Sequence, residues 1–285
     1  MDVKQMMEYY SHQSEVSDPD SQRLLFKDLP ADLPGLVKVV QNTIIHVYWS
    51  DRMGAQISRE RKDEEMNLRT VENILRQAAS MQGGSLLEER LMESRLVGTC
   101  RDYSTLLTSI FRSQGVPARA RCGFGTYFLP DHFEDHWVCE WWNENEQRWV
   151  MTDAQLDDLQ KSVMKITFDT LDLPPGQFVT GGDAWQMCRA GNEDPNKFGI
   201  FEFSGMDFIR GNLMRDFLSL NKVEVLPWDF WGLLKKPFDR LTGEELALFD
   251  HLAELTSPVL KGEEALRAFV ELREIYDSEP GLRFE

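Results

Sequence analysis

The chain has 285 residues, of which 42% are hydrophobic and 28% are charged, a composition typical of a globular protein that is long enough for about two domains. Its 31 Lys and Arg stand against 48 Asp and Glu, a formal net charge of -17, so we expect neither a nucleic acid nor an anionic membrane surface as a partner. Its 19 Gly and 12 Pro are close to average use, which excludes collagen-like and wholly disordered chains.

Cysteines are sparse, and no two of the four form a close C-x-x-C pair. This spacing argues against a disulfide framework and against a zinc or redox site. The first residues lack the apolar segment of a signal peptide, and no window approaches the roughly 18 apolar residues of a membrane-spanning helix. We therefore expect a cytoplasmic protein with free thiols. The cysteines are Cys100, Cys122, Cys139 and Cys188.

Residues 1–84 are predicted to form an N-terminal helical region. Residues 11–23 lack apolar periodicity and are expected to be a solvated lead-in rather than a packed element. Apolar residues recur with helical spacing from Val71 to Ala79, behind a run of mixed charge from Arg59 to Glu65 that is expected to be a solvated helix face. The glycine pair Gly83-Gly84 ends the region.

Residues 85–180 are predicted to form an α+β core. Start and stop signals agree on one helix, with Thr99 at the N-cap, Cys100 at the first helical position and Gly115 just beyond the end. Three aromatic and β-branched segments follow, and they are expected to be strands at 118–128, 136–142 and 147–153. We therefore expect a helix packed on a small antiparallel sheet.

Residues 181–285 are predicted to form a mainly helical C-terminal region packed on the core. Residues 181–186, Gly-Gly-Asp-Ala-Trp-Gln, are interpreted as a turn and loop. Thr242 and Glu245 form the pattern of a capping box at the start of a helix, and a final helix is expected near 263–276. The aromatic segment 226–232 is expected to dock on the core.

The predicted helix gives Cys100 a chemical role. A thiolate at the first helical position lies beside unpaired backbone N–H groups and the positive end of the helix dipole, which favours a nucleophile. The alternative is that Cys100 is simply a small buried residue. His136 begins one predicted strand and Asp153 ends the next, and antiparallel pairing would bring the two together as the base and orienting acid of a Cys-His-Asp triad.

Residues 98–153 resemble the core of the transglutaminase-like superfamily. The resemblance lies in the Gly-x-Cys helix start, the helix ending R-S-Q-G-V-P-A-R, the segment D-H-W-V-C-E-W and an aromatic-x-x-x-D strand. It implies a papain-like α+β core with Cys100 as nucleophile, His136 as base and Asp153 as orienting acid. The flanking helices are similar to those of stand-alone bacterial members, and neither calcium nor another cofactor is implied. Family members often have Pro after the acid, where this chain has Ala154.

The mechanism implied is acyl transfer through a thioester on an amide bond of a peptide, protein or small amide substrate, with hydrolysis slightly preferred over transfer to an amine. The backbone N–H of Cys100 would stabilise the oxyanion together with a second donor, for which Trp49 and Gln82 are candidates. Further candidate substrate-binding residues are Arg119 and Arg121, which alternate along one strand and could instead form structural ion pairs, and Trp185. The oligomeric state is not predicted.

Two other functions remain open. The same fold could be a non-enzymatic module that binds a peptide or protein through its aromatic surface. Alternatively, His132 and His136, four residues apart among carboxylates, could belong to a metal-dependent hydrolase, although the segment is expected to be a loop rather than the helix that such a site needs.

Overall fold

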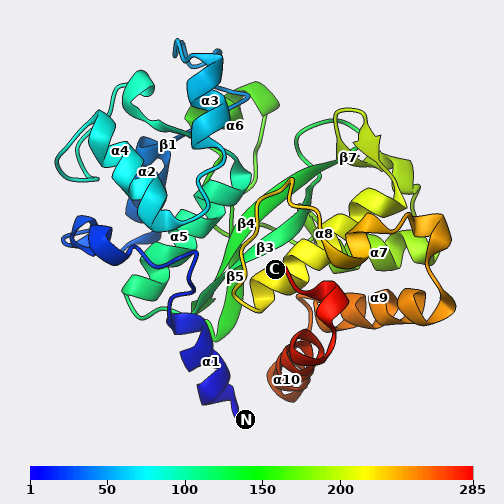
Figure 1. Ribbon diagram of the computed structural model, residues 1–285. Coiled ribbons are helices and arrows are strands. Elements are labelled where there is room, and N and C mark those ends of the chain that lie inside the picture. The colour runs from blue at the N-terminus through cyan, green and yellow to red at the C-terminus, as the bar shows by residue number, and fades with distance from the viewer. Residues whose placement is uncertain (285) are drawn as a thin grey trace. The chain divides into compact units, whose positions relative to one another are not determined.

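The computed structural model of the protein describes residues 1–284 and contains two compact units (Figure 1). The first, called here the Cys100 unit, comprises residues 10–120 and 138–173, and the second, the His136 unit, comprises residues 1–9, 121–137 and 174–285. Two long strands, β3 (Ala118–Gly125) and β4 (Phe133–Asn143), each contribute residues to both units. The units therefore cut across the three expected regions, 1–84, 85–180 and 181–285.

The main sheet confirms the expected α+β class. Its strand order is β6-β3-β4-β7-β8, and β5 pairs with β4. The β4–β5 pair is antiparallel, as expected; β3–β6 and β7–β8 are also antiparallel and β4–β7 is parallel, and the strands β6, β7 and β8 had not been predicted. The remaining strands are β5 (Arg148–Thr152), β6 (Phe178–Thr180), β7 (Phe198–Ile200) and β8 (Phe203–Ser204).

The Cys100 unit packs its helices around the cysteine-bearing helix α5 (Cys100–Ser113), whose apolar stripe contributes to a core shared with β3, β4 and the helices α2 and α4. A second, two-stranded parallel sheet joins β1 (Ile44–His46) to β2 (Leu96–Gly98), which the sequence had not indicated. The other helices of this unit are α2 (Leu33–Thr43), α3 (Arg59–Glu65), α4 (Val71–Met81) and α6 (Asp158–Met164).

The expectation that residues 11–23 form a solvated lead-in is wrong. Ser17 is fully buried, its carbonyl accepts a hydrogen bond from the hydroxyl of Ser109 (2.5 Å), and its hydroxyl accepts one from Arg112 (2.8 Å). Residues 20–26 add a short 3-10 helix. The segment is held by hydrogen bonds rather than by apolar packing, so hydrophobic periodicity could not predict it.

The His136 unit is built on helix α8 (Met206–Leu220), which packs beside α7 and α9, as Figure 1 shows. Its core combines residues of α8 with Phe124 of β3, Phe198 of β7 and Phe249 of α9. The predicted capping box of Thr242 and Glu245 is confirmed at the start of α9. The other helices are α1 (Val3–Ser11, mostly in this unit), α7 (Gly181–Arg189), α9 (Gly243–Leu255) and α10 (Gly262–Ser278).

The interpretation of residues 181–186 as a turn and loop is wrong, because they begin helix α7 with Thr180 as the N-cap. The two glycines serve close helix packing. A Cβ atom on Gly181 would lie 2.4 Å from the backbone nitrogen of Leu213 in α8, and one on Gly182 would lie 2.2 Å from the hydroxyl of Thr256. The glycines therefore mark a helix contact rather than a chain reversal.

The aromatic segment 226–232 docks only in part. The Trp231 side chain is buried and its indole N–H donates to the carbonyl of Leu282 (3.1 Å), whereas Trp228 and Phe230 are exposed. Within residues 1–284, the structure contains no helix with both the length and the apolar character needed to cross a membrane.

Candidate active site

Cys100 is the first residue of α5 and follows directly from the end of β2. Thr99 is the N-cap residue, and its backbone N–H donates to the carboxylate of Asp102 (2.8 Å), as the predicted capping arrangement requires. Gly98 leaves no room for a side chain, because a Cβ atom there would lie 2.9 Å from Ile44 and 3.0 Å from Asp102. The Cys100 side chain is 8% exposed. The predicted placement of this thiol at a helix N-terminus is confirmed.

A buried ion pair fixes the first turn of α5. The guanidinium of Arg101, which is fully buried, donates to Asp102 (3.0 Å) and to the carbonyl of Arg69 (2.7 Å). Burial raises the pKa of Asp102, although the Arg101 charge and the Thr99 N–H both oppose this shift. The backbone around Cys100 is thus fixed by groups that are themselves buried.

The parallel pairing of β1 with β2 brings a second segment to the same sheet end as Cys100. The register pairs His46 with Gly98, and the backbone N–H of Val47 donates to the Gly98 carbonyl (3.0 Å). Because parallel strands end at the same edge, the turn after β1 begins beside the start of α5. Trp49 lies in this turn, is partly buried, and has the guanidinium of Arg52 over its ring at 5.3 Å.

His46 is a buried residue that the sequence analysis missed. Its side chain is 7% exposed, its Nδ1 accepts a hydrogen bond from the backbone N–H of Tyr48 (3.3 Å), and its ring lies 6.4 Å from that of Tyr103, one turn after Cys100 in α5. The available signal was the pair of short apolar segments Ile-Ile-His and Leu-Val-Gly, the second of which ends two residues before Cys100.

Asp153 follows the predicted hairpin, which is confirmed by the register of Cys139 opposite Thr152. Asp153 is 1% exposed, its backbone N–H donates to Thr170, and its Oδ1 accepts the N–H of Gln155 (3.0 Å). This last bond provides a local turn without the proline that relatives often have.

Asp153 and the first turns of α5 share one buried environment within the Cys100 unit. The hydroxyl of Ser104 donates to the carbonyl of Val138 (2.6 Å), which ties α5 to β4. Burial raises the pKa of Tyr103, and the nearby carboxylates, Asp153 among them, raise it further. The carboxylate of Asp153 therefore lies close enough to Tyr103, one helical turn after Cys100, to contribute to the raised pKa of its hydroxyl.

His136 lies in the His136 unit, in the first half of β4, and is 2% exposed. Aromatic rings surround it: the ring centres of Phe128, Tyr127 and Phe178 lie 4.8, 5.9 and 6.5 Å from that of the imidazole. Two residues further along β4, Val138 belongs to the Cys100 unit.

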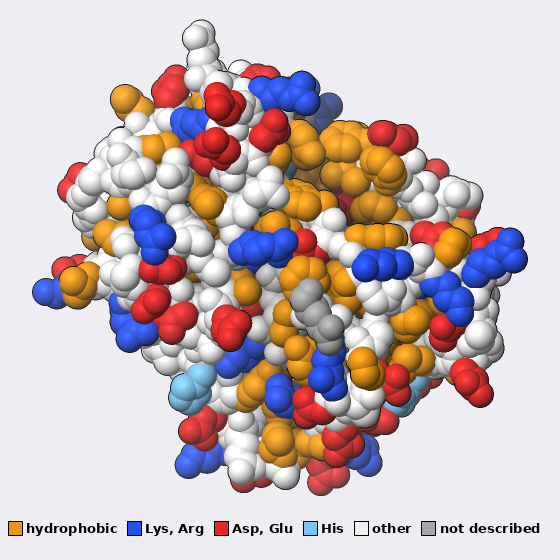
Figure 2. Space-filling view, in the orientation of Figure 1, with side chains coloured by type: hydrophobic (Ala, Val, Ile, Leu, Met, Phe, Trp, Pro, Cys, Tyr) orange, Lys and Arg blue, Asp and Glu red, His pale blue; other side chains and the backbone are white. Residues whose placement is uncertain are grey.

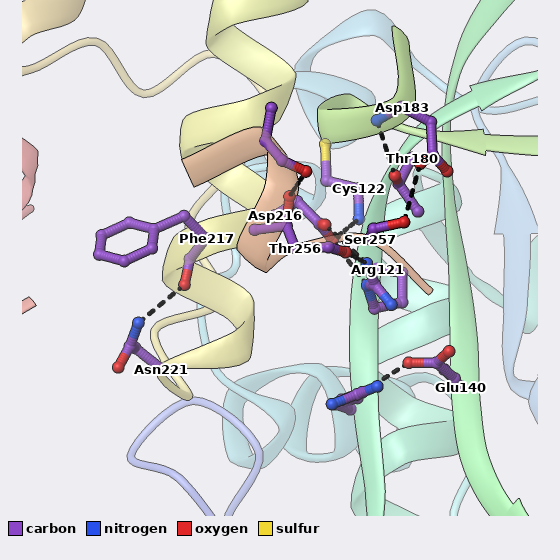
Figure 3. Close-up of polar contacts among 12 residues, drawn as sticks. Arg121, Cys122, Glu140, Thr180, Asp183, Asp216, Phe217, Asn221, Thr256 and Ser257 are labelled. Atoms are coloured by element: carbon purple, nitrogen blue, oxygen red, sulfur yellow. Dashed lines mark hydrogen bonds and ion pairs between the residues drawn. The ribbon is translucent and has the colours of Figure 1, made fainter. Parts of the chain in front are cut away.

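Arg119 and Arg121 both form ion pairs. Arg119 donates to Glu140 (2.5 Å) and stacks over Trp149 at 4.1 Å. Arg121 donates two hydrogen bonds of 2.9 Å to the carboxylate of Asp216 in α8, one from Nε and one from Nη2. Its Nη2 also donates to the backbone carbonyl of Thr256 (Figure 3). The structural ion pair, which the sequence left open as an alternative to substrate binding, is thus present at both positions.

The remaining candidates have structural contacts. The Trp185 ring is fully buried in the core of the His136 unit, and its indole N–H donates to Asp250 (2.7 Å). The side chain of Gln82 donates to the carbonyl of Glu89 (3.2 Å) at the end of α4.

The two histidines of the metal hypothesis do not lie on a helix. His132 directly precedes β4, its Nε2 lies 3.1 Å from a carboxylate oxygen of Glu134, and three residues of extended chain separate it from His136. Among residues 1–284 there is no group of three or more His, Cys, Asp or Glu side chains that could hold a metal ion.

Comparison with known proteins gives one family match, over part of the chain. Residues 51–154 match the model of the Transglutaminase-like superfamily, a segment that contains Cys100, His136 and Asp153. A solved structure described as a "Putative Cysteine Protease" from Cytophaga hutchinsonii aligns over 54% of this chain and 43% of that one, at 15% identity and a TM-score of 0.32. No curated protein sequence matches significantly.

Proposed function

We propose that the protein is a cysteine enzyme that acts on amide bonds by acyl transfer through a thioester, a proposal supported by the match of residues 51–154 to the transglutaminase-like family model. The observation that carries this proposal is the position of Cys100 as the first residue of α5, in a unit where Asp153 is buried near the same helix. Peptides, proteins and small amides are the proposed substrates. The proposed location is the cytoplasm, which the small number of cysteines in the sequence supports.

The proposed triad is Cys100, His136 and Asp153. The geometry of β4 supports the inclusion of His136: an extended strand rises about 3.3 Å per residue, so the backbone of His136 lies about 7 Å from that of Val138. The Val138 carbonyl is the group that α5 contacts through Ser104. Asp153 directly follows Thr152, which pairs with Cys139, three residues after His136 in the sequence.

In the proposed reaction, the Cys100 thiolate attacks the substrate carbonyl and forms a tetrahedral intermediate. Protonated His136 gives its proton to the departing amine, which leaves a thioester on the sulfur. Asp153 holds the imidazole in the productive tautomer and stabilises its charged form. Water or a second amine then attacks the thioester, and the imidazole accepts the proton that this nucleophile loses.

The oxyanion would be stabilised by the backbone N–H of Cys100 and by a second donor. Trp49 is the better candidate, because its turn begins beside the start of α5. The amide of Gln82 already donates to Glu89. We therefore propose the indole N–H of Trp49 as the second donor.

Selective alkylation tests the proposal. Burial raises the pKa of Cys139 to about 12 and that of Cys188 to about 11, so these thiols stay protonated at neutral pH. The helix N-terminus favours the thiolate of Cys100. We expect limited iodoacetamide treatment, followed by peptide mapping, to label Cys100 first. Labelling of Cys139 or Cys188 at an equal rate would contradict the proposed nucleophile.

An activated ester, p-nitrophenyl acetate, distinguishes the enzyme from a binding module. An acyl-transfer enzyme should give a burst of nitrophenolate from p-nitrophenyl acetate as the thioester forms, and Cys100→Ala should remove that burst. A binding module with a structural cysteine should show no burst in either protein.

A further inference from the structure

Helix α2 of the Cys100 unit lies beneath a surface of mixed charge. Figure 2 shows acidic and basic side chains interspersed among uncharged ones over the part of the molecule where Figure 1 draws α2 and α4. Pairs at such a surface, such as Arg76 with Glu72 (2.6 Å), contribute little to stability. The contacts that distinguish α2 therefore lie on its buried side, and one of them reaches the proposed active site.

A side chain of α2 holds the chain that follows Asp153. Gln41, in the last turn of α2, donates from its Nε2 to the backbone carbonyls of Ala154 (3.2 Å) and Leu156 (3.3 Å), all within the Cys100 unit. Both accepting residues are almost fully buried, so their carbonyls depend on a donor from the protein. Among residues 1–284, no other group donates to either carbonyl.

The peptide group between Ala154 and Gln155 connects Gln41 to Asp153. Its carbonyl oxygen accepts from Gln41, and its N–H donates to Oδ1 of Asp153 (3.0 Å). Because this peptide group is trans and planar, its C=O and N–H point in opposite directions. Holding the carbonyl therefore sets the direction of the N–H, and with it the position of the carboxylate oxygen that accepts from it. Hydrogen bonds in such a chain also strengthen one another.

The backbone of Gln41 is fixed by the segment that leads to Cys100. Its carbonyl, one of those left unpaired at the end of a helix, accepts from Nη1 of the buried Arg95 (3.0 Å). Arg95 directly precedes β2, which ends two residues before Cys100. Ala154 shares a hydrophobic core with Val40 of α2. Helix α2 is thus held both to the strand before the thiol and to the chain after the acid.

The chain before Asp153 is held by separate bonds. The backbone N–H of Asp153 donates to the carbonyl of Thr170 (2.9 Å), and the hydroxyl of Thr152 donates to the carbonyl of Leu171 (2.7 Å). These bonds fix the place where Asp153 leaves β5, but they do not restrict the peptide group that follows. The orientation of the carboxylate therefore depends in part on Gln41.

We propose that Gln41 is a positioning residue for Asp153: its amide holds the Ala154–Gln155 peptide group so that the carboxylate keeps the orientation that the proposed triad requires. This inference rests on the proposed function, in which Asp153 orients the base. Gln41 acts on the reaction only through Asp153. Its removal should therefore slow the reaction when Asp153 is present and have little effect when Asp153 is absent.

A double-mutant cycle tests the inference. Gln41→Met removes both donors and keeps the length of the side chain, and Asp153→Ala removes the carboxylate to be positioned. In the parent, Gln41→Met should lower the burst rate with p-nitrophenyl acetate about ten- to a hundredfold, the scale expected when a catalytic group is misplaced by about 1 Å. In the Asp153→Ala background, the same change should alter the rate by less than about twofold.

Gln13→Met is the matched control. Gln13 lies in the same unit, is also a glutamine whose Nε2 donates to a backbone carbonyl, and contacts Ser109 (2.9 Å) in the second half of α5. Its replacement removes the same kind of hydrogen bond at a distance from Asp153. The burst rate of this variant should stay within about twofold of the parent.

The pH dependence of Cys100 alkylation by iodoacetamide is a second readout. Gln41→Met should move its midpoint upward, because a misplaced Asp153 no longer stabilises the charged imidazole that favours the thiolate. Gln13→Met should leave the midpoint in place. A loss of stability alone does not move it, so this measurement distinguishes positioning from general support of the fold.

The outcomes separate this inference from the proposed function. A burst rate that Asp153→Ala leaves unchanged, or no burst in the parent, would overturn the proposed triad and this inference with it. If Asp153→Ala slows the burst and Gln41→Met does not, the triad stands and the inference is wrong. An equal loss from Gln41→Met in both backgrounds would also overturn it. Gln41→Asn, which keeps the amide but is one methylene shorter, decides if Gln41→Met fails to fold.

Discussion

At the scale of single residues, the proposed chemistry depends on side chains that are almost fully buried. Asp153 accepts the N–H of Gln155 and lies where its charge reaches Tyr103. A carboxylate fixed in this way can orient an imidazole without taking part in bond making. Its removal should therefore slow the reaction without stopping it.

Asp153→Asn should retain the hydrogen bond from Gln155 and lose the negative charge. By analogy with the serine-protease triad, where loss of the orienting acid costs about 10⁴ in kcat, we expect the burst rate with p-nitrophenyl acetate to fall by two to four orders of magnitude, roughly. The burst rate is measured by stopped-flow absorbance of the released nitrophenolate. Asp157→Asn, at the N-cap of α6, is the control for general loss of acidic charge in the same unit. A burst rate within about threefold of the parent would remove Asp153 from the mechanism.

The two buried histidines make a second test at this scale. His136 is assigned as the base, whereas His46 lies at the end of β1 with its Nδ1 already accepting the N–H of Tyr48. His136→Ala should move the midpoint of Cys100 alkylation against pH upward, toward the value of about 8.5 of a free thiol. His46→Ala should leave that midpoint in place. If His46→Ala shifts it and His136→Ala does not, the base is His46.

At the scale of elements, α5 could be predicted closely and α7 could not, for physical reasons. The ends of α5 carry local signals, Thr99 with Asp102 at one end and Gly115 with a φ of +76° at the other. In α7 the glycines suggested a turn, because close helix packing depends on the distant residues Leu213 and Thr256. His46 was missed because its strand, β1, has only three residues. Such a strand is too short to show the alternation of apolar and polar side chains.

The ion pair of Arg121 with Asp216 joins β3 to α8, and Figure 3 shows both side chains meeting at the backbone of Cys122, whose N–H also donates to Asp216 (2.9 Å). Arg121→Met should leave an uncompensated buried carboxylate and lower the free energy of unfolding by about 3–5 kcal/mol in urea titration.

An exposed pair in the same unit is the control for this prediction. Arg240 and Asp239 are separated by 3.9 Å, and both side chains are more than three-quarters exposed. Arg240→Met should change the free energy of unfolding by less than about 1 kcal/mol. Equal effects of the two variants would mean that the buried pair has no special role in joining β3 to α8.

At the scale of the whole molecule, composition and local pattern could predict the α+β class, the Cys-bearing helix and the hairpin that ends before Asp153. They could not predict the way in which distant parts of the chain combine. Residues 11–23 are held through Ser17 by hydrogen bonds to α5, and the parallel pairs β1–β2 and β4–β7 join segments more than 50 residues apart. Such contacts produce no regular spacing of apolar residues in the sequence.

Burial and net charge together predict how stability depends on pH. Burial raises the pKa of Asp102, Asp135 and Glu134, so in the folded protein these groups bind protons at pH values where the unfolded chain has released them. A raised carboxyl pKa makes stability fall as pH rises above the unfolded value. The carboxyls whose pKa is lowered, which are Glu72, Glu193, Glu245 and Asp250, are ionised in both states above about pH 5 and add no slope there.

We therefore expect the melting temperature to be higher at about pH 5, just above the unfolded-state values of these carboxyls, than at pH 8, and repulsion within a chain of net charge -17 acts in the same direction. Sodium chloride separates the two causes, because it screens exposed charges and leaves buried carboxyls almost unaffected. Asp135 accepts a hydrogen bond from Asn212 and lies near the charge of Arg215, and Asp135→Asn keeps a partner for Asn212 while removing the titration. At high salt this variant should show a smaller difference between the two pH values than the parent. A melting temperature that rises from about pH 5 to pH 8 in the parent would contradict the raised pKa values.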